Sequence, residues 1–408
     1  MSRRLVSRAV SVAAVLAISV GLAGCAGSGN FQIFQSSCSS NNNCPPDPEF
    51  LYATSPNQIL AFKINSSTGA LGTPLAMPGP NQSIGMTATG FGNLYVSDFL
   101  NDSVDGFSIN PSTGGLTAIA GSPFSLGGTP PGAGGLSGFV SGGSYLYVTD
   151  LNEGKVAGFA DNPINGMLTP VPGSPFAAGN TPVQAVQTVS LINAGADKSF
   201  LYVSNLNDSA GGISAFTIDS NSGALTPIAG SPFPTGATGS FPGPSAMVVG
   251  DNTVGILYVA LAGTANVNNK IAGFVIDANT GVLTAVAGSP FATGADPLYI
   301  ALVPITNVGF REFLYTANVG DNTISAFTAD GNTGVLTPVS GSPYAGGTSL
   351  SGLAVTPDGR FLYAADPQAK TIRAYVVDGT TGALSPIPGS PFTAGSSPTL
   401  LTVAVCHC

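Results

Sequence analysis

Charged side chains are scarce in this chain, and tryptophan is absent altogether. Its 408 residues include 11 basic and 20 acidic ones, about 8%, whereas globular domains usually carry about 25%. Long exposed helices need charged faces, so they are nearly excluded. Because acidic residues outnumber basic ones and no basic patch exists to displace counterions, nucleic acid is excluded as a partner. The lack of tryptophan also argues against a carbohydrate-stacking platform.

Glycine and proline are abundant, with 55 and 32 residues respectively. Both are poorly tolerated inside helices. Together they remain below the range of about 25–30% that is typical of low-complexity chains, and 43% of the residues are hydrophobic, so disorder is disfavoured. The composition therefore predicts a large, turn-rich, all-β protein.

The first 24 residues have the three parts of a secretory signal peptide. A basic region with Arg3, Arg4 and Arg8 precedes a mostly apolar stretch, which ends in Leu22-Ala23-Gly24-Cys25. This end resembles a bacterial lipobox, in which the cysteine carries a lipid; the alternative is a helix that happens to end in a cysteine. No later apolar run approaches the roughly 20 residues needed to span a bilayer. We therefore expect Cys25 to be lipidated and the protein to be attached to a membrane through this lipid.

The segment 25–48, rich in Ser, Asn and Gly, is expected to be a flexible tether. It would hold the protein outside the cytoplasm, in the periplasm or at the cell surface.

A repeat of about 50 residues is the strongest signal in the sequence. A Leu-Tyr pair recurs seven times, ending at Tyr52, Tyr95, Tyr147, Tyr202, Tyr258, Tyr315 and Tyr363. About ten residues later a second predicted strand carries an aromatic residue, at Phe62, Phe107, Phe159, Phe216, Phe274, Phe327 and Tyr375. A glycine then supplies the positive φ of a tight turn, at Gly69, Gly114, Gly166, Gly223, Gly281, Gly334 and Gly382. In six of the seven units a Gly-Ser-Pro-aromatic segment follows, the last centred on Pro391.

The sequence predicts four strands in each unit, and four such strands form one blade of a β-propeller. The first unit begins directly at Glu49-Phe50-Leu51-Tyr52 and lacks its leading strand, whereas an unpartnered strand covers residues 398–405. If this C-terminal strand completes the first blade, no sheet edge is left at the seam. The prediction is a seven-bladed β-propeller over residues 49–405, followed by a Cys-His-Cys tail at 406–408.

The repeat resembles the seven-bladed lactonase family. The resemblance rests on units such as Phe313-Leu314-Tyr315-Thr316-Ala317-Asn318 and Thr333-Gly334-Val335-Leu336-Thr337-Pro338. That family includes the bacterial propeller type of 6-phosphogluconolactonase and is similar to the surface-layer YVTN propellers. The resemblance implies a propeller fold over residues 49–405 and, less specifically, hydrolysis of a lactone.

Lactone hydrolysis needs a base to activate water and a donor or cation to stabilise the oxyanion. The only histidine, His407, lies beyond the last predicted strand. The three glutamates, Glu49, Glu153 and Glu312, are better explained as solvated turn residues. We find no convergent catalytic set, so the catalytic residues stay unassigned, and we expect neither a cofactor nor a bound metal.

A weaker candidate site lies where the Leu-Tyr strands end. Polar residues occupy equivalent places in five units, at Asp98, Asp150, Asn205, Asn318 and Asp366. In a ring they would converge at one mouth of the central channel, with Lys155, Lys270 and Lys370 in the same loops, and could bind a cation or a small polar molecule. The alternative is that each residue caps its own turn through a local hydrogen bond.

After Cys25, the cysteines are confined to the two ends, at Cys38 and Cys44 and at Cys406 and Cys408. Outside the cytoplasm disulfides are the expected state. Because closure of the ring brings the termini together, we predict a bridge between the N-terminal and the C-terminal pair. Separate local pairs and zinc ligation are the alternatives.

Two functions remain open at this point. The first is a monomeric, non-catalytic binding scaffold at the cell envelope, which uses its loops or channel mouth to hold a protein or small-molecule ligand. The second is an exported lactone hydrolase, a carboxylic ester hydrolase. The poverty of ionisable groups favours the first function, and the family resemblance favours the second.

Overall fold

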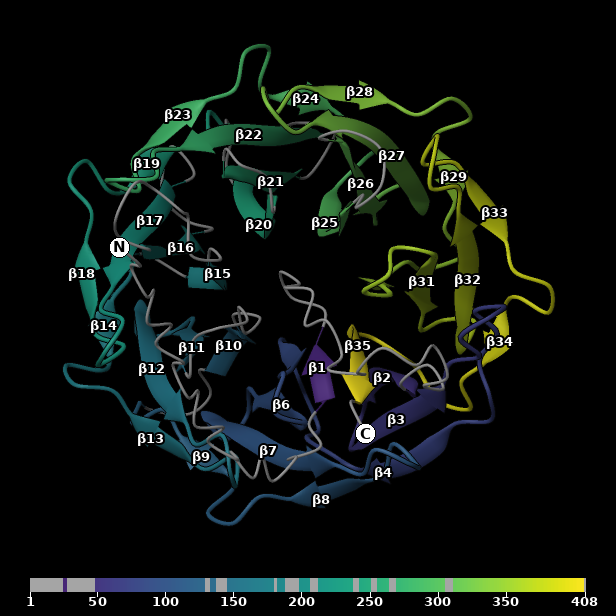
Figure 1. Ribbon diagram of the computed structural model, residues 1–408, viewed down its shortest axis with the longest axis horizontal. Coiled ribbons are helices and arrows are strands. Elements are labelled where there is room, and N and C mark those ends of the chain that lie inside the picture. Colours follow the sequence, from purple (N-terminus) through teal and green to yellow (C-terminus); the bar gives the residue numbers. More distant parts are fainter. Residues whose placement is uncertain are drawn as a thin grey trace, which may run out of the picture.

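Seven sheets form a closed ring around a common axis (Figure 1). The computed structural model describes residues 25–27, 48–128, 133–136, 145–179, 182–187, 198–205, 212–237, 242–250, 255–263, 269–304 and 311–406. Over these ranges every regular secondary-structure element is a β-strand. The described residues contain no helix that is long and apolar enough to cross a membrane. The predicted seven-bladed, all-β propeller is therefore confirmed. The signal peptide and nearly all of the tether lie outside the described residues.

The blades share one order of four strands, with the leading strand on the axis side of the second strand and the fourth strand at the periphery (Figure 1). The first blade comprises β35 (Leu401–Cys406), β2 (Glu49–Ser55), β3 (Gln58–Lys63) and β4 (Leu75–Pro78). The second comprises β5 (Met86–Ala88), β6 (Asn93–Asp98), β7 (Ser103–Ile109) and β8 (Leu116–Ala118). The third comprises β10 (Ala133–Leu136), β11 (Tyr145–Asp150), β12 (Lys155–Asp161) and β13 (Leu168–Pro170). The fourth comprises β15 (Pro182–Gln187), β16 (Ser199–Asn205), β17 (Gly212–Ile218) and β18 (Leu225–Pro227).

The remaining three blades follow the same plan. The fifth comprises β20 (Pro242–Gly250), β21 (Ile256–Gly263), β22 (Lys270–Ile276) and β23 (Leu283–Ala285). The sixth comprises β25 (Pro297–Pro304), β26 (Arg311–Asn318), β27 (Thr323–Asp330) and β28 (Leu336–Pro338). The seventh comprises β30 (Gly352–Val355), β31 (Phe361–Asp366), β32 (Thr371–Val377) and β33 (Leu384–Pro386). Short strands that pair with the third strand of blades two to seven are β9 (Phe124–Ser125), β14 (Phe176–Ala177), β19 (Phe233–Pro234), β24 (Phe291–Ala292), β29 (Tyr344–Ala345) and β34 (Phe392–Thr393).

The C-terminal strand closes the ring as predicted. Strand β35 pairs with β2, with Ala53 opposite Leu401 and Glu49 opposite Val405. Thr54 extends the pairing, because its backbone N–H donates to the Leu400 carbonyl at 3.1 Å. On the other side of β35, β1 (Cys25–Gly27) adds an innermost strand that places Cys25 opposite Cys406. Both edges of β35 are thereby paired.

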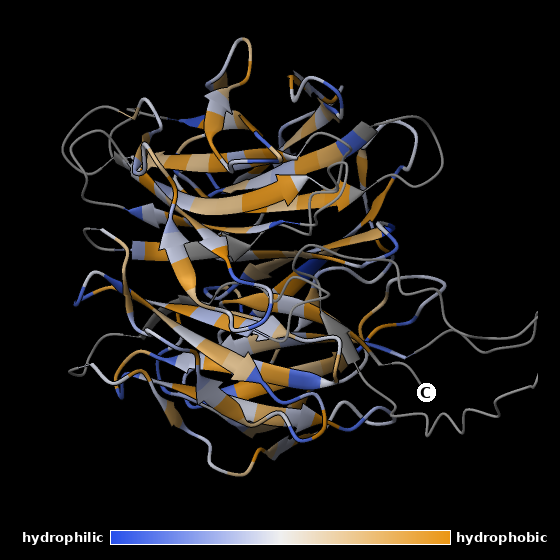
Figure 2. Cartoon of the chain, turned by 60° about the vertical axis from the view of Figure 1, so that its left-hand side comes forward, coloured by the Kyte–Doolittle hydropathy of each residue, from blue (hydrophilic) through white to orange (hydrophobic). Residues whose placement is uncertain are grey.

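The hydrophobic core lies between neighbouring blades. One cluster joins Leu51 and Phe62 of the first blade to Phe361 and Ile372 of the seventh. Apolar residues recur along the strands in the rotated view of Figure 2. Successive side chains of a strand point to opposite faces of the sheet, so consecutive apolar residues let each sheet bury both of its faces against its neighbours.

The repeated tyrosines hold neighbouring blades together. In each of the seven units the hydroxyl donates to the carbonyl of the turn glycine in the next blade, at 2.6–3.0 Å, and Tyr363 of the last blade reaches Gly69 of the first. All seven tyrosines are fully buried. A buried hydroxyl needs such a partner.

The turn glycines fit closely against the preceding blade. Gly114 has φ +72°, and a Cβ atom there would lie 2.5 Å from Cδ1 of Phe50. The Gly-Ser-Pro turns are similarly architectural: their Ser-Pro bonds are cis, and the Ser122 hydroxyl, for example, accepts the Gly106 backbone N–H at 2.9 Å. The repeated motifs thus build the ring.

One junction, between the second and third blades, breaks the apolar pattern. Asp161 stands where the other six blades place Ile, Ala or Val, and Asn93 stands where they place an aromatic residue or Ile. Asp161 is only 2% exposed, and its Oδ1 lies 2.8 Å from the Tyr95 hydroxyl, which also lies 2.6 Å from the Gly166 carbonyl oxygen. Burial raises the pKa of Asp161 to about 6, against the opposing effect of hydrogen bonds from Tyr95 and Asn93.

Candidate functional site

The five polar residues predicted at the channel mouth lie at one end of the ring, where each second strand ends. We call this end the mouth face: it comprises the turns between the second and third strands and the connections between blades. All five residues are buried, with exposed fractions of 7% or less: Asp98, Asp150, Asn205, Asn318 and Asp366. So little exposure leaves them small contact areas for a ligand.

Three of the five residues cap local turns. Asp98 accepts the Asn101 backbone N–H at 3.2 Å, and Asp150 accepts those of Asn152 and Glu153 at 3.1 and 3.0 Å. Asp366 accepts the Ala369 N–H at 3.0 Å. These bonds favour the alternative interpretation made from the sequence, that the residues cap turns. Ligand binding by them stays a prediction.

The two asparagines bind serines on the adjacent third strand. Asn205 donates to the Ser214 hydroxyl at 2.9 Å, and Asn318 donates to the Ser325 hydroxyl at 2.8 Å. The same third-strand position carries Asp105 in the second blade and Arg373 in the seventh. The position is therefore used differently around the ring: neutral pairs in blades four and six, and charged side chains in blades two and seven.

Blades two and seven have opposite electrostatics at this position. Burial raises the pKa of Asp105 to about 6, and the charge of Asp98 adds to the shift. At Asp366 burial acts in the same direction, but hydrogen bonds from Thr348 and Ala369 and the charge of Arg373 outweigh it, so its pKa is lowered. The second blade thus holds a pair of like charges where the seventh holds opposite ones.

The third-blade turn combines acidic groups with a cation. The Lys155 ammonium lies 2.7 Å from Glu153 Oε2, and their side chains are 40% and 24% exposed. The hydrogen bond and the charge of Glu153 raise the pKa of Lys155. Two further carboxyl groups close to Glu153, those of Asp150 and Asp102, belong to residues that are 4% and 1% exposed. Around Gly128, a Cβ atom would meet Asp150 Oδ2 at 2.7 Å, Asp102 Oδ2 at 2.8 Å and Glu153 Oε1 at 3.1 Å.

This turn is the best candidate for chemistry on the mouth face. An accessible carboxylate can remove a proton from water, and an accessible ammonium can stabilise an oxyanion. Sequence reasoning treated Glu153 as a solvated turn residue and overlooked Asp102, Asp105 and Arg373. Comparing the units position by position identifies Asp102, because Asn57 and Asn322 occupy the same left-handed turn position in other blades.

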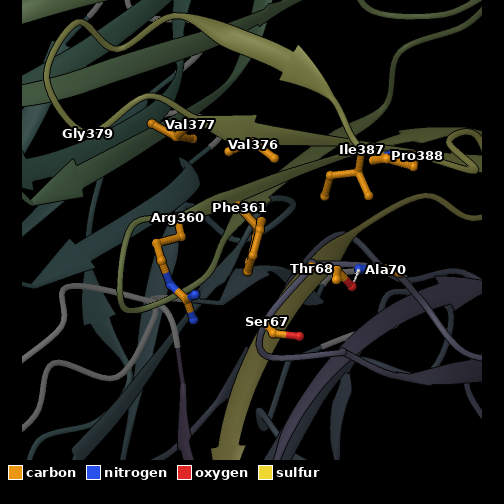
Figure 3. Close-up of a pocket in the computed structure, with 10 residues that line it drawn as sticks. All are labelled: Ser67, Thr68, Ala70, Arg360, Phe361, Val376, Val377, Gly379, Ile387 and Pro388. Atoms are coloured by element: carbon orange, nitrogen blue, oxygen red, sulfur yellow. Dashed lines mark hydrogen bonds between the residues drawn. The ribbon is translucent and has the colours of Figure 1, made fainter.

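The opposite face carries a cleft of about 720 Å³ at the junction of blades seven and one (Figure 3). Phe361, Val376 and Ile387 line it, and Arg360 stands at its edge. The Arg360 guanidinium donates to the Ser66 carbonyl at 2.6 Å. Arg360 directly precedes β31, so it lies at the end of the ring opposite the mouth face.

Glu49, at the start of β2, is coupled to this arginine. Burial, and then the charge of Asp358, raises the pKa of Glu49 to about 7, against the opposing charge of Arg360. Because the Arg360 guanidinium donates to the Ser66 carbonyl and to the Asp358 carboxylate, the cleft presents mainly apolar surface.

Across the described ranges no group of His, Cys, Asp and Glu has the arrangement of a metal site. The predicted disulfide cysteines Cys38, Cys44 and Cys408 lie outside those ranges, as does His407, so the disulfides stay predictions. Cys25 and Cys406 are described by their backbone alone.

The fold and repeat define the class of protein as a seven-bladed β-propeller. Residues 267–401 match the family described as Lactonase, 7-bladed beta-propeller. The predicted resemblance is thereby confirmed over this part of the chain. No curated protein matches the chain.

Solved structures agree on the fold. A Bacteroides uniformis protein proposed to be a 6-phosphogluconolactonase is 17% identical, with a TM-score of 0.69 over 88% of this chain and 100% of its own. A Bacteroides fragilis protein with the same proposed activity is also 17% identical, with a TM-score of 0.64 over 89% and 99%. The periplasmic gluconolactonase PpgL of Pseudomonas aeruginosa is 17% identical, with a TM-score of 0.63 over 88% and 99%.

The family match supports a lactonase-type hydrolase, which was the second of the two functions considered from the sequence. The comparisons give no support to a binding scaffold. Because the solved structures are only 17% identical to this chain, they support the fold and not the activity.

Proposed function

We propose that this protein is a lactone hydrolase that acts outside the cytoplasm, with its reaction centre at the Glu153–Lys155 turn of the third blade. The observation that carries the proposal is this ion pair, since it places an accessible carboxylate and an accessible ammonium 2.7 Å apart on the mouth face. The match of residues 267–401 to the lactonase family supports the reaction type.

The two side chains divide the chemistry of ring opening between them. Glu153 removes a proton from water as the water oxygen bonds to the lactone carbonyl carbon, and the carbonyl electrons move onto its oxygen. The Lys155 ammonium stabilises this oxyanion with an N–H that does not bind Glu153. When the carbonyl re-forms, the ring C–O bond breaks, and the leaving alkoxide takes the proton from Glu153. The product is a hydroxy acid, which releases its proton at neutral pH.

Charge at this turn favours an uncharged substrate. Lys155 is paired with Glu153, and the Glu153 carboxyl lies around Gly128 with those of Asp150 and Asp102, both almost fully buried. A phosphate group entering here would be repelled, and a phosphorylated sugar lactone is a cytoplasmic metabolite. We therefore propose unphosphorylated lactones as the substrate class.

Substitution at the turn tests the assignment. Uncharged γ- and δ-lactones are offered to purified protein, and acid release is followed by titration at constant pH. We expect Glu153→Gln to lower kcat/KM by at least about 100-fold, as for loss of a general base, and Lys155→Met by about 100-fold, as for loss of an oxyanion donor. The matched control is Lys270→Met, because Lys270 begins the third strand of the fifth blade as Lys155 begins that of the third, but lies opposite Leu261 instead of Asp150.

If turnover persists in both Glu153→Gln and Lys155→Met, the reaction does not take place at the third-blade turn. A wild-type protein inactive on every lactone would contradict the function itself.

For location, we propose that Cys25 carries a lipid anchor. The proposal rests on the lipobox-like Leu22-Ala23-Gly24-Cys25 and the basic and apolar regions before it. The similar propeller from Pseudomonas aeruginosa is described as periplasmic.

A further inference from the structure

We infer that Asp102 is a positioning residue that acts through Glu153: its carboxylate, which lies beside that of Glu153 around Gly128, makes Glu153 a stronger base. The inference deepens the proposed function and rests on it. Asp102 belongs to the second blade and Glu153 to the third, so the two carboxyl groups approach each other across a blade junction.

The backbone role of Asp102 does not require a charge. Asp102 occupies a left-handed turn position (φ 50°), and its Oδ2 accepts the backbone N–H of Gly128, in the connection to the next blade, at 2.9 Å. Asn322 does the same in the sixth blade, where its Oδ1 accepts the Leu350 N–H at 3.0 Å. Asn269 likewise accepts the Asp296 N–H at 3.1 Å in the fifth blade. An amide therefore suffices for the architecture, and the second blade alone among these three carries a carboxylate.

The position of Asp102 makes its charge effective. Its oxygen and those of Asp150 and Glu153 surround Gly128, so no two of the three can be farther apart than about 6 Å, within which like charges disfavour each other's ionised form. Asp102 is 1% exposed, and its Oδ1 is buried without a hydrogen-bond partner. Little water screens a charge in such a place.

Asp102 itself responds to the same surroundings. Burial raises its pKa, the charges of Asp150 and Glu153 add to the shift, and the hydrogen bond from Gly128 opposes it. Lys155, paired with Glu153, is the cation of this group. A negative charge on Asp102 makes proton uptake by Glu153 more favourable, which strengthens Glu153 as a base for water.

The test is the pH dependence of kcat/KM in Asp102→Asn, measured on uncharged lactones. The substitution keeps an acceptor for Gly128 and copies Asn322, so the turn is preserved. We expect the acid limb of the profile to move to lower pH by on the order of 0.5 to 1 unit, and the plateau to fall roughly 3- to 10-fold because Glu153 is a weaker base. Asn322→Asp, which adds a carboxylate at the equivalent place in the sixth blade, should leave the profile unchanged.

An acid limb that stays in place in Asp102→Asn overturns the inference, even if overall activity falls, because a purely structural role would lower activity without moving the limb. A wild-type protein without turnover contradicts the proposed function instead. In that case the titration of the Glu153 carboxyl carbon, followed by NMR in wild type and Asp102→Asn, decides the electrostatic claim. The same midpoint in both proteins refutes it, and a lower midpoint in the variant supports it.

Discussion

The buried Asp161 predicts an unusual dependence of stability on pH. In the other six junctions the tyrosine hydroxyl donates to the carbonyl of the turn glycine. At the junction of blades two and three, the single hydroxyl proton of Tyr95 lies within reach of both Asp161 and the Gly166 carbonyl. Protonated Asp161 resolves the competition, because it donates to the Tyr95 oxygen while Tyr95 donates to Gly166.

The magnitude follows from the pKa shift. The pKa of Asp161 rises from 3.8 to about 6 in the folded protein. A shift of roughly 2 units corresponds to about 3 kcal/mol. Because the folded-state pKa is the higher one, the folded protein binds the proton more tightly than the unfolded chain. The contribution is therefore fully present below about pH 4 and is lost as the pH rises through about 6.

Asp161→Asn removes this titration and nearly preserves the shape of the side chain. As the pH rises from 4 to 7, the wild type loses the contribution of Asp161 and the variant does not. The free energy of unfolding of the variant, relative to that of the wild type, should therefore rise by up to about 3 kcal/mol over this range. Any cost of an unsatisfied amide group is constant over that range and does not alter the change. Urea unfolding at a series of pH values measures it.

The control is Asp378→Asn, because hydrogen bonds from Thr381 and Thr380 lower the pKa of this exposed carboxyl and its titration falls below the tested window. A difference between Asp161→Asn and wild type that is constant from pH 4 to pH 7 would refute the reasoning.

Two further predictions concern the ring and its anchor. Gly114→Ala should lower the free energy of unfolding by about 3 kcal/mol in urea unfolding, because a left-handed alanine is strained and its Cβ atom would overlap Phe50; Gly379→Ala, where a Cβ atom meets nothing within 4 Å, should be nearly neutral, and equal effects would contradict the argument. Cys25→Ser should move the protein from the membrane to the soluble fraction on cell fractionation, and mass spectrometry should show a lipid on Cys25 in the wild type only; an unlipidated wild-type Cys25 would disprove the anchor.

Much of the fold could be predicted from the sequence because the signals are local and repeated. Leu-Tyr pairs, turn glycines and Gly-Ser-Pro segments each specify one strand or turn, and seven copies make chance agreement improbable. The closure by the C-terminal strand also followed from counting strands, since Glu49 starts a unit that lacks its leading strand.

The candidate site could not be predicted in the same way. The polar residues that recur at strand ends, such as Asn205 and Asn318, are buried parts of the blade architecture. The groups of the proposed reaction centre do not recur, so the repeat pattern hides them. Asp102 and Glu153 come from different blades, and their proximity depends on how the second blade packs against the third.

The sequence by itself therefore determined the class of fold, the number of blades and the partner of the last strand, because these follow from local propensity and from the need to pair sheet edges. Only the tertiary structure decided which side chains meet. It placed three carboxyl groups around Gly128 and buried Asp161 beside Tyr95. Electrostatic coupling falls off steeply with distance and depends on exclusion of water, and both are properties of the packed ring.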